Sequence, residues 1–202
     1  MTKKLLLTCG MIALTTGLCL AEVEIGKPAP TFTLPDTNGK THSLSDLKGK
    51  YVVLEWYQPD CPFVRAHYRS GIMQALQKEY TAKGVVWLSI DSSAPGEQGN
   101  YPADKLNQFA ARDGAARTAL LMDPAGNVGR SYGAQTTPDM YIIDPSGNLV
   151  YKGAIDNKRS TDIEDAKTAT NYVKSALDAL LNGKPVPTSS SRPYGCSVKY
   201  AS

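Results

Sequence analysis

The sequence predicts an α/β domain in which a mixed central sheet is flanked by helices on both faces. Three observations lead to this fold class. Apolar, β-branched runs typical of buried strands alternate with segments whose apolar residues recur at helical spacing. Two such runs late in the chain are joined by a short polar turn, which adds an antiparallel hairpin. At 202 residues the chain is also long enough for one domain with a sizeable core.

The first half of the chain contains a hairpin, a strand and a helix. Residues 31–34 and 41–44 flank an Asn38-Gly39 turn, a pattern typical of a β-hairpin. Residues 51–56 are mostly β-branched and aromatic and predict a central strand. From 61 to 83 apolar residues recur every fourth position, which predicts a single helix over that range.

The second half continues the alternation of strands and helices. A strand is expected first, followed by a loop rich in Ser, Gly and Pro, and Pro102 then suits the start of a helix. In order, we expect a strand at 85–90, the loop at 92–101, a helix at 102–110, a strand at 118–122, a short helix near 128–132, paired strands at 140–144 and 149–153, and a last helix at 173–180.

The first residues have the pattern of a secretory signal peptide. Lys3-Lys4 precede an apolar run from Leu5 to Leu14, and small residues end the segment at Ala21. The apolar run is shorter than a membrane-spanning helix requires. We therefore expect residues 1–21 to be removed and the rest of the chain to be periplasmic or secreted. The remaining chain is nearly neutral, so neither a nucleic acid nor stable membrane insertion is predicted.

Beyond the signal peptide the sequence predicts one domain, 22–184, followed by a tail at 185–202. This part of the chain contains two cysteines, Cys61 in the domain and Cys196 in the tail. An even number of cysteines in an exported protein favours a disulfide.

Cys61 lies where the predicted central strand passes into a helix. A thiol in the first turn of a helix faces unpaired amide groups and the positive end of the helix dipole, which favours the thiolate. Arg65, one turn on, adds positive charge. Asp60 opposes this effect, although it is also a suitable N-cap residue. A small buried residue in a strand–helix corner is the alternative interpretation of Cys61.

Three stretches resemble a known family. They are "IGKPAPTFTLPDTNGK" at 25–40, "LEWYQPDCPF" at 54–63 and "QTTPDMYIIDPSGNLVYKG" at 135–153. Together with the order of elements, they are similar to the thioredoxin-like fold of the peroxiredoxin-like branch of the AhpC/TSA family. The resemblance covers about 25–181 and implies a hairpin extension before the fold and an extended tail after it. Members of this branch carry one cysteine at the first position of a C-x-x-C site, and here Val64 stands at the second.

The resemblance also implies roles for individual residues. Cys61 would be the redox nucleophile. Thr137 and Pro138 match the cis-proline loop that lies against the cysteine and shapes the substrate site. Pro59 and Arg65, beside the nucleophile, would complete the substrate-binding residues. No cofactor is implied.

The chain departs from both parent patterns at three positions. Dithiol reductases have a cysteine where Val64 stands. Typical peroxiredoxins place a hydroxyl residue where this chain has Gln58, and an arginine just before the late strand, where this chain has Thr137-Pro138-Asp139.

Cys196 has three possible roles. It can resolve an oxidised Cys61 within the chain, form a permanent bridge to Cys61, or remain a separate thiol. The tail sequence "SRPYGCSVKY" supplies apolar and aromatic side chains that can be buried, so we expect the tail to dock on the domain.

The expected function is an exported thiol oxidoreductase acting on disulfides or peroxides, with a thiol protein or a small thiol as electron donor. The alternative is a non-enzymatic module with a structural Cys61–Cys196 bridge, or a metal-handling protein. His67 does not share a helix face with Cys61, so no metal site is predicted and a surface or half-buried histidine is expected. No oligomeric state is predicted.

Overall fold

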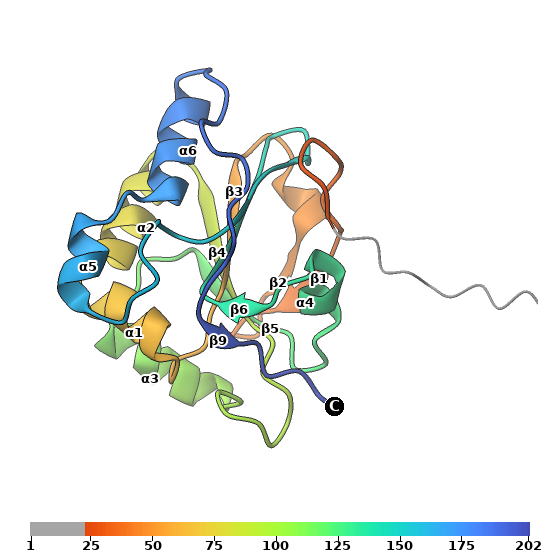
Figure 1. The fold of residues 1–202 in the computed structure, drawn as a ribbon. Coiled ribbons are helices and arrows are strands. Elements are labelled where there is room, and N and C mark those ends of the chain that lie inside the picture. The colour runs from red at the N-terminus through yellow and green to blue at the C-terminus, as the bar shows by residue number, and fades with distance from the viewer. Residues whose placement is uncertain (1–22) are drawn as a thin grey trace, which may run out of the picture.

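The computed structural model describes residues 23–202, so the expected signal peptide at 1–21 lies outside the described residues. Its centre is a five-stranded sheet with the strand order β5-β4-β3-β7-β8 (Figure 1). Strands β3, β4 and β5 are parallel to one another, whereas β7 is antiparallel to β3 and to β8. The sheet is therefore mixed, as predicted. The strands are β3 Val52–Trp56, β4 Val86–Asp91, β5 Ala119–Met122, β7 Asp139–Ile143 and β8 Leu149–Gly153.

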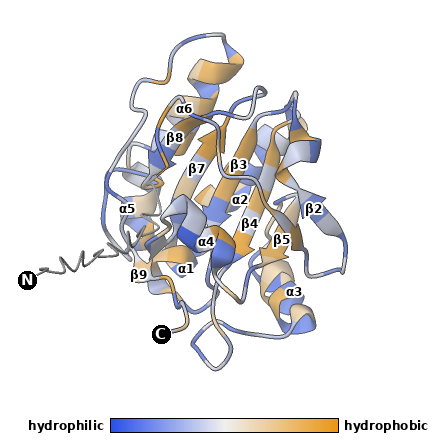
Figure 2. Cartoon of the chain, turned by 90° about the vertical axis from the view of Figure 1, so that its right-hand side faces the viewer, coloured by the Kyte–Doolittle hydropathy of each residue, from blue (hydrophilic) through white to orange (hydrophobic). Residues whose placement is uncertain are grey.

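Alternate residues of the strands face two different apolar layers. Val53 belongs to a core cluster with residues of the long helices, whereas Val52 and Leu54 belong to a cluster on the opposite face. Figure 2 shows that apolar residues are concentrated in the central strands. The first layer contains α1 Pro62–Arg69, α2 Ile72–Ala82, α3 Ala103–Arg112 and α6 Tyr172–Leu181; the second contains α4 Asn127–Tyr132, the 3₁₀ helix Leu44–Leu47, and the hairpin of β1 Thr33–Pro35 and β2 Thr41–Ser43.

The predicted single helix at 61–83 is wrong, because the structure has two helices there. Helix α1 ends at Arg69 and α2 begins at Ile72. Gly71 between them has φ +80°, a left-handed conformation that residues other than glycine adopt only at a cost. Apolar residues continue at the same spacing on both sides of the break, so the periodicity did not reveal it.

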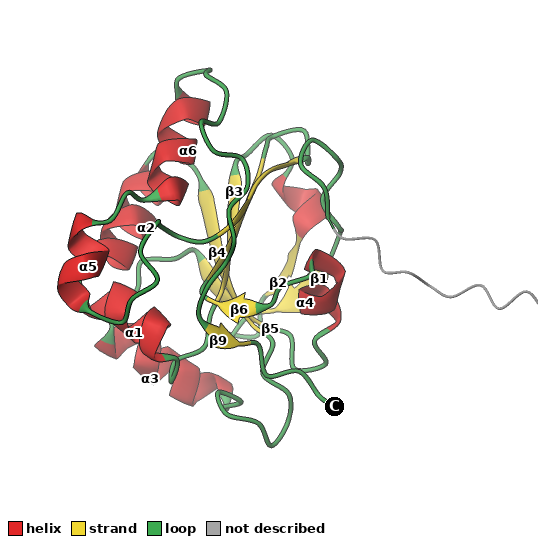
Figure 3. Cartoon of the chain, viewed as in Figure 1, coloured by secondary structure: helices red, strands yellow, loops and turns green. Residues whose placement is uncertain are grey.

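Besides the 3₁₀ helix at Leu44–Leu47, three short elements were not predicted. Helix α5 Ile163–Thr168 packs near α1. Strand β6 Thr136–Thr137 precedes β7, and strand β9 Cys196–Ser197 lies in the tail. Figure 3 shows that the tail is otherwise loop and runs back across the domain to β6. The tail therefore docks, as expected from its aromatic residues.

Residues 23–202 include no helix that combines the length and the apolar character required to cross a membrane.

Candidate active site

The turn between β3 and α1 places Cys61 at the start of a helix. The backbone N–H of Cys61 donates to the carbonyl of Gln58, 3.2 Å away, which closes the turn. Cys61 is the N-cap residue of α1, and its carbonyl accepts the N–H of Arg65 at 2.9 Å. Pro62 occupies the first helical position, where its missing N–H is not needed. The sulfur therefore lies at the N-terminal end of α1, as the sequence predicted.

Cys196 lies beside Cys61 although 135 positions separate them in the sequence. The two sulfur atoms are 2.9 Å apart and unbonded. Strand β9 pairs antiparallel with β6 and places Cys196 opposite Thr137. The carbonyl oxygen of Thr137 is in turn 2.9 Å from the Cys61 sulfur. The peptide bond between Thr137 and Pro138 is cis, as expected from the resemblance. A strand–helix turn, the cis-proline loop and the tail thus meet at one point.

The two sulfurs differ in exposure. Cys61 is 1 % exposed, whereas Cys196 is only half-buried. Cys196 belongs to the tail strand β9, which pairs with β6 and lies beside Cys61. With the tail docked, the sulfur that an external molecule meets first is that of Cys196.

The surroundings of Cys196 also change its ionisation. Burial, the neighbouring Cys61 sulfur and its negative charge raise the pKa of the Cys196 thiol to about 12, although the backbone N–H of Phe63 and the Lys199 ammonium oppose the shift. Two negative charges on sulfurs this close disfavour each other. While the pair is reduced, Cys196 keeps its proton.

The residues assigned to substrate binding lie around this pair in different ways. Thr137 and Pro138 are buried, and the carbonyl of Thr137 contacts the Cys61 sulfur. Pro59 is buried in the turn before Cys61. Arg65 is exposed on α1, and the structure gives it no ion pair among residues 23–202. Asp60 is not the N-cap of α1: its carboxylate accepts the hydroxyl of Tyr101 at 2.7 Å instead.

Gln58 connects the turn to the loop at 92–101. Its Oε1 accepts the N–H of Asp60 at 2.6 Å, and its Nε2 donates to the carbonyl of Gln98 at 3.1 Å. This loop therefore forms part of the rim of the site. Because both ends of the Gln58 amide are bonded in this way, Gln58 holds the turn against the loop.

The expectation for His67 is wrong, because its side chain is 1 % exposed. Its Nε2 lies 3.3 Å from the hydroxyl of Tyr194, and its Nδ1 lies 3.9 Å from the carboxylate of Asp156. Burial lowers the pKa of His67 and so favours the neutral ring. Helical spacing did not reveal this burial, because the tail and the loop that cover His67 come from the end of the chain. Across residues 23–202, no three His, Cys, Asp or Glu side chains form a group that could hold a metal ion.

Asp139, directly after Pro138, has a buried side-chain carboxyl. Nothing in the sequence indicated that its pKa would lie close to neutral pH. Its Oδ2 accepts the backbone N–H of Gln135 at 3.1 Å, and its Oδ1 has no hydrogen-bond partner. Burial raises the pKa of Asp139 to about 7, although hydrogen bonds to its carboxylate counteract the rise.

A pH-dependent stability follows from Asp139. In an unfolded chain an Asp carboxyl loses its proton near pH 4, whereas folded Asp139 keeps it to about pH 7. The folded state binds more protons in this window, so its stability falls as pH rises. We expect the difference in unfolding free energy between wild type and Asp139→Asn to fall by up to about 1.4 kcal/mol per pH unit from pH 4 to 7.

Urea unfolding of both proteins at a series of pH values measures this difference. Asp91, whose pKa burial raises to about 6, is present in both proteins, so its contribution cancels. Parallel stability curves for the two proteins would contradict the assignment to Asp139.

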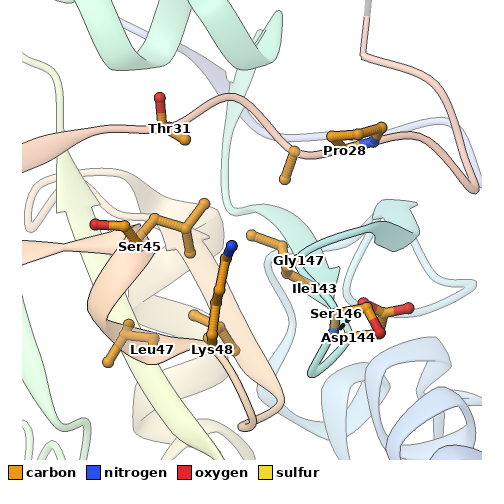
Figure 4. Close-up of a pocket in the computed structure, with 12 residues that line it drawn as sticks. Pro28, Thr31, Ser45, Leu47, Lys48, Ile143, Asp144, Ser146 and Gly147 are labelled. Carbon is orange, nitrogen blue, oxygen red and sulfur yellow. Dashed lines mark hydrogen bonds between the residues drawn. The ribbon is translucent and has the colours of Figure 1, made fainter.

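A separate hollow of about 340 Å³ lies at the other end of the sheet. Figure 4 shows Pro28 and Thr31 on one side of it and Leu47 and Lys48 on another. Its wall includes the start of β3 and the end of β7, whereas Cys61 follows the end of β3. This hollow is therefore not part of the two-cysteine site.

Several known proteins are similar to this chain. The thiol-disulfide oxidoreductase ResA of Bacillus thuringiensis subsp. konkukian (strain 97-27) is 29 % identical over 150 residues, which cover 72 % of this chain and 81 % of the relative. The thioredoxin-like protein YneN of Bacillus subtilis (strain 168) is 32 % identical over 127 residues, covering 62 % of this chain and 68 % of the relative.

Solved structures give the same result for the fold. An uncharacterized conserved protein from Geobacillus kaustophilus superposes with a TM-score of 0.78 and 30 % identity, over 88 % of this chain and 93 % of that chain. A putative thiol:disulfide interchange protein DsbE from Chlorobium tepidum superposes with a TM-score of 0.54 and 27 % identity, over 65 % and 85 %.

The family model described as the AhpC/TSA family matches residues 25–152. The matched segment includes Cys61, Thr137 and Pro138 but ends before the tail with Cys196. The matched residues make up more than half of the chain and carry the turn, the cis-proline loop and the hairpin described above. By this match, the chain belongs to the AhpC/TSA family.

Proposed function

We propose that this protein is an exported thiol–disulfide oxidoreductase in which Cys61 is the nucleophile and Cys196 the resolving thiol. The family and the relatives named above make the chain a thiol-based oxidoreductase that works with a thiol or disulfide redox partner. The proposal adds the roles of the two sulfurs, the preference for disulfides over peroxides, and export, which the pattern of residues 1–21 supports.

The observation that carries the proposal is the 2.9 Å separation of the two sulfurs at the start of α1. A disulfide bond is about 2.05 Å long, so the pair can close with a small movement. A residue at the N-cap of a helix is also where a negative sulfur is best stabilised. A C-x-x-C site would have its second thiol at position 64, where this chain has Val64. In this proposal Cys196 supplies that second thiol instead.

The reaction follows from this arrangement. The Cys61 thiolate attacks one sulfur of a substrate disulfide, forming a mixed disulfide and releasing the first substrate thiolate. The released substrate thiolate takes up the proton of Cys196, and the Cys196 thiolate then attacks the Cys61 sulfur, forming the Cys61–Cys196 disulfide and releasing the second substrate thiolate. The substrate disulfide gains two electrons and the protein dithiol loses two. A protein thiol or a small thiol reduces the intramolecular disulfide and restores the starting state.

Disulfides fit the site better than peroxides. The position at which peroxiredoxins hold a hydroxyl is Gln58, whose amide is used on both sides by the turn and the loop. The position after Pro138 is a buried carboxyl instead of an arginine. The site therefore lacks both groups that would orient and polarise a peroxide.

Trapping the mixed disulfide tests the proposal. Protein from residue 22 onward carries only the cysteines Cys61 and Cys196. Reduced wild type should convert a model peptide disulfide to two thiols and gain one intramolecular disulfide, whereas Cys196→Ser should stop at a stable adduct on Cys61. Mass spectrometry of the quenched reactions identifies both products, and a parallel reaction with hydrogen peroxide compares the rates.

Two results would overturn parts of this function. An adduct on Cys196 in the wild type, with none on Cys61 in Cys196→Ser, would reverse the assigned roles. A peroxide reaction at least about 100-fold faster than the disulfide reaction would make the protein a peroxidase instead.

A further inference from the structure

We propose that Tyr194 is a positioning residue of this site. Its buried hydroxyl latches the tail strand onto the domain, so that Cys196 is held against Cys61 and the strand must leave before another polypeptide can reach Cys61. The inference rests on the proposed function, since it concerns how the two thiols meet and how a substrate gains access to them.

The latch is a buried cluster of three polar side chains. The hydroxyl of Tyr194 donates to the carboxylate of Asp156 at 2.5 Å and lies 3.3 Å from His67 Nε2. The hydrogen of the Tyr194 hydroxyl is used in the bond to Asp156. In the contact with His67 the hydroxyl oxygen is therefore the acceptor, and the ring donates from Nε2. All three side chains are at most 6 % exposed. A charged partner makes the hydrogen bond to Tyr194 a strong one.

The latch and the nucleophile are connected through α1. Phe63 and His67 are one helical turn apart on this helix, which begins directly after Cys61. The Phe63 ring meets the Tyr194 ring edge-on at 5.8 Å. Tyr194 in turn is only two residues before Cys196. The contacts of Tyr194 with Phe63 and His67 on α1 therefore set where the Cys196 sulfur lies relative to the Cys61 sulfur.

Gly195 lets the tail approach closely between the latch and the second sulfur. It has φ +149°, and a Cβ at this position would overlap the carbonyl oxygen of Thr137, the group that contacts Cys61. Residues with side chains are thus excluded from position 195 while the strand is docked. Alanine here should push β9 away from β6 without removing any polar group.

Beyond Cys196 the tail remains fixed. The N–H of Val198 donates to the carbonyl of Gln135 at 3.0 Å, and the N–H of Ala94 donates to Lys199 at 2.8 Å. The hydroxyl of Tyr200 donates to Ala134 at 2.8 Å. These contacts fix the strand on both sides of Cys196.

Docking of the tail has a consequence for access. In residues 23–202, the sheet partner of β6 is β9 alone, so the tail occupies the edge at which an extended chain would pair beside Pro138. Cys61 beneath it is 1 % exposed. A polypeptide disulfide therefore reaches Cys61 in the fraction of molecules whose tail is undocked.

Alkylation of Cys61 measures this fraction. In a Cys196→Ser background from residue 22 onward, Cys61 is the only cysteine. Added Tyr194→Phe should raise the rate of modification by iodoacetamide about tenfold or more, because it removes a hydrogen bond to a charged group that exists only when the tail is docked. Gly195→Ala should have the same effect through a different contact. Tyr51→Phe, which removes a hydroxyl bonded to Leu180 at the opposite end of β3, is the control and should have no effect.

Amide hydrogen exchange separates unlatching from general loss of stability. The Val198 N–H, bonded to Gln135, should lose protection by the same factor by which alkylation rises, while amides of β3 keep theirs. Equal alkylation rates in the parent, Tyr194→Phe and Gly195→Ala proteins would overturn the latch. Equal loss of protection in β3 and at Val198 would overturn it too, since the effect would then be global.

Disulfide exchange with a model peptide distinguishes the latch from the proposed function. Faster alkylation combined with faster mixed-disulfide formation supports both. Faster alkylation without any exchange supports the latch and contradicts the proposed function. Exchange at an unchanged rate, with unchanged alkylation, contradicts the latch and leaves the function standing.

Discussion

Replacing Cys61 by serine should lower the rate of disulfide exchange by about 10³-fold or more, because a serine hydroxyl is a far weaker nucleophile at neutral pH and cannot form a disulfide. The fold should persist. A serine hydroxyl at this position can donate to the carbonyl of Thr137, as the sulfur is placed to do. Burial of the extra polar group should cost about 1–3 kcal/mol of stability.

The matched comparison is Cys196→Ser, which removes the other sulfur of the same pair. This variant should keep the first step of the reaction and lose the second, so that its rate of mixed-disulfide formation stays measurable. Stopped-flow reaction of both reduced variants with a peptide disulfide measures these rates. A Cys61→Ser protein that reacts as fast as wild type would show that the nucleophile is another group.

Glu55 gives the second large effect, on stability. Its side chain is 0 % exposed in the middle of β3. One carboxylate oxygen accepts from Trp87 Nε1 at 2.9 Å, from Ser89 Oγ at 2.7 Å and from Gln77 Nε2 at 3.2 Å. The other accepts the hydroxyl of Tyr68 at 3.1 Å. Four donors on β4, α1 and α2 thus converge on a single acidic residue in the sheet.

Glu55→Ala should lower the free energy of unfolding by about 3–5 kcal/mol, because it leaves buried donors without an acceptor and removes a buried charge from its network. The negative charge of Glu55 also helps to raise the pKa of the buried Arg117 guanidinium, although burial opposes this, so the substitution removes part of what offsets the burial of that charge. A loss of this size is a large fraction of the total stability of a typical domain. Urea unfolding measures the change.

Glu79→Ala is the control for the loss of a glutamate. Glu79 lies on the surface of α2 and pairs with Lys83 one turn on, an exposed pair whose removal should cost less than about 1 kcal/mol. Equal stabilities for Glu55→Ala and Glu79→Ala would contradict the role assigned to the buried carboxylate.

Several elements could be predicted because their signals are local. The run 51–56 forms the central strand, since β-branched and aromatic residues pack well in a sheet that is covered on both faces. Pro62 directly after Cys61 suits the first position of a helix, and the structure places it there. The hairpin at β7 and β8 follows from the turn residues between the two strands.

Other features could not be predicted because their causes are distant in the sequence. His67 was expected near the surface, yet Asp156 and Tyr194, 89 and 127 positions further on, enclose it. A glutamate in a strand would be expected to face solvent. Glu55 is buried instead, because hydrogen-bond donors from β4, α1 and α2 surround its carboxylate. Gly71 interrupts a helix whose apolar spacing is continuous on both sides.

By itself, the sequence determined the position of the proposed nucleophile: an apolar strand, a turn and a proline place Cys61 at the start of a helix through interactions among neighbouring residues. Only the tertiary structure decided that Cys196 meets it instead of remaining a separate thiol. Strands β6 and β9 are only two residues long each and are far apart in the sequence. Strands this short have no periodic pattern that a sequence could reveal. Their register depends on the close approach of Gly195 and the burial of Tyr194, which exist only once the domain surface that receives them has formed.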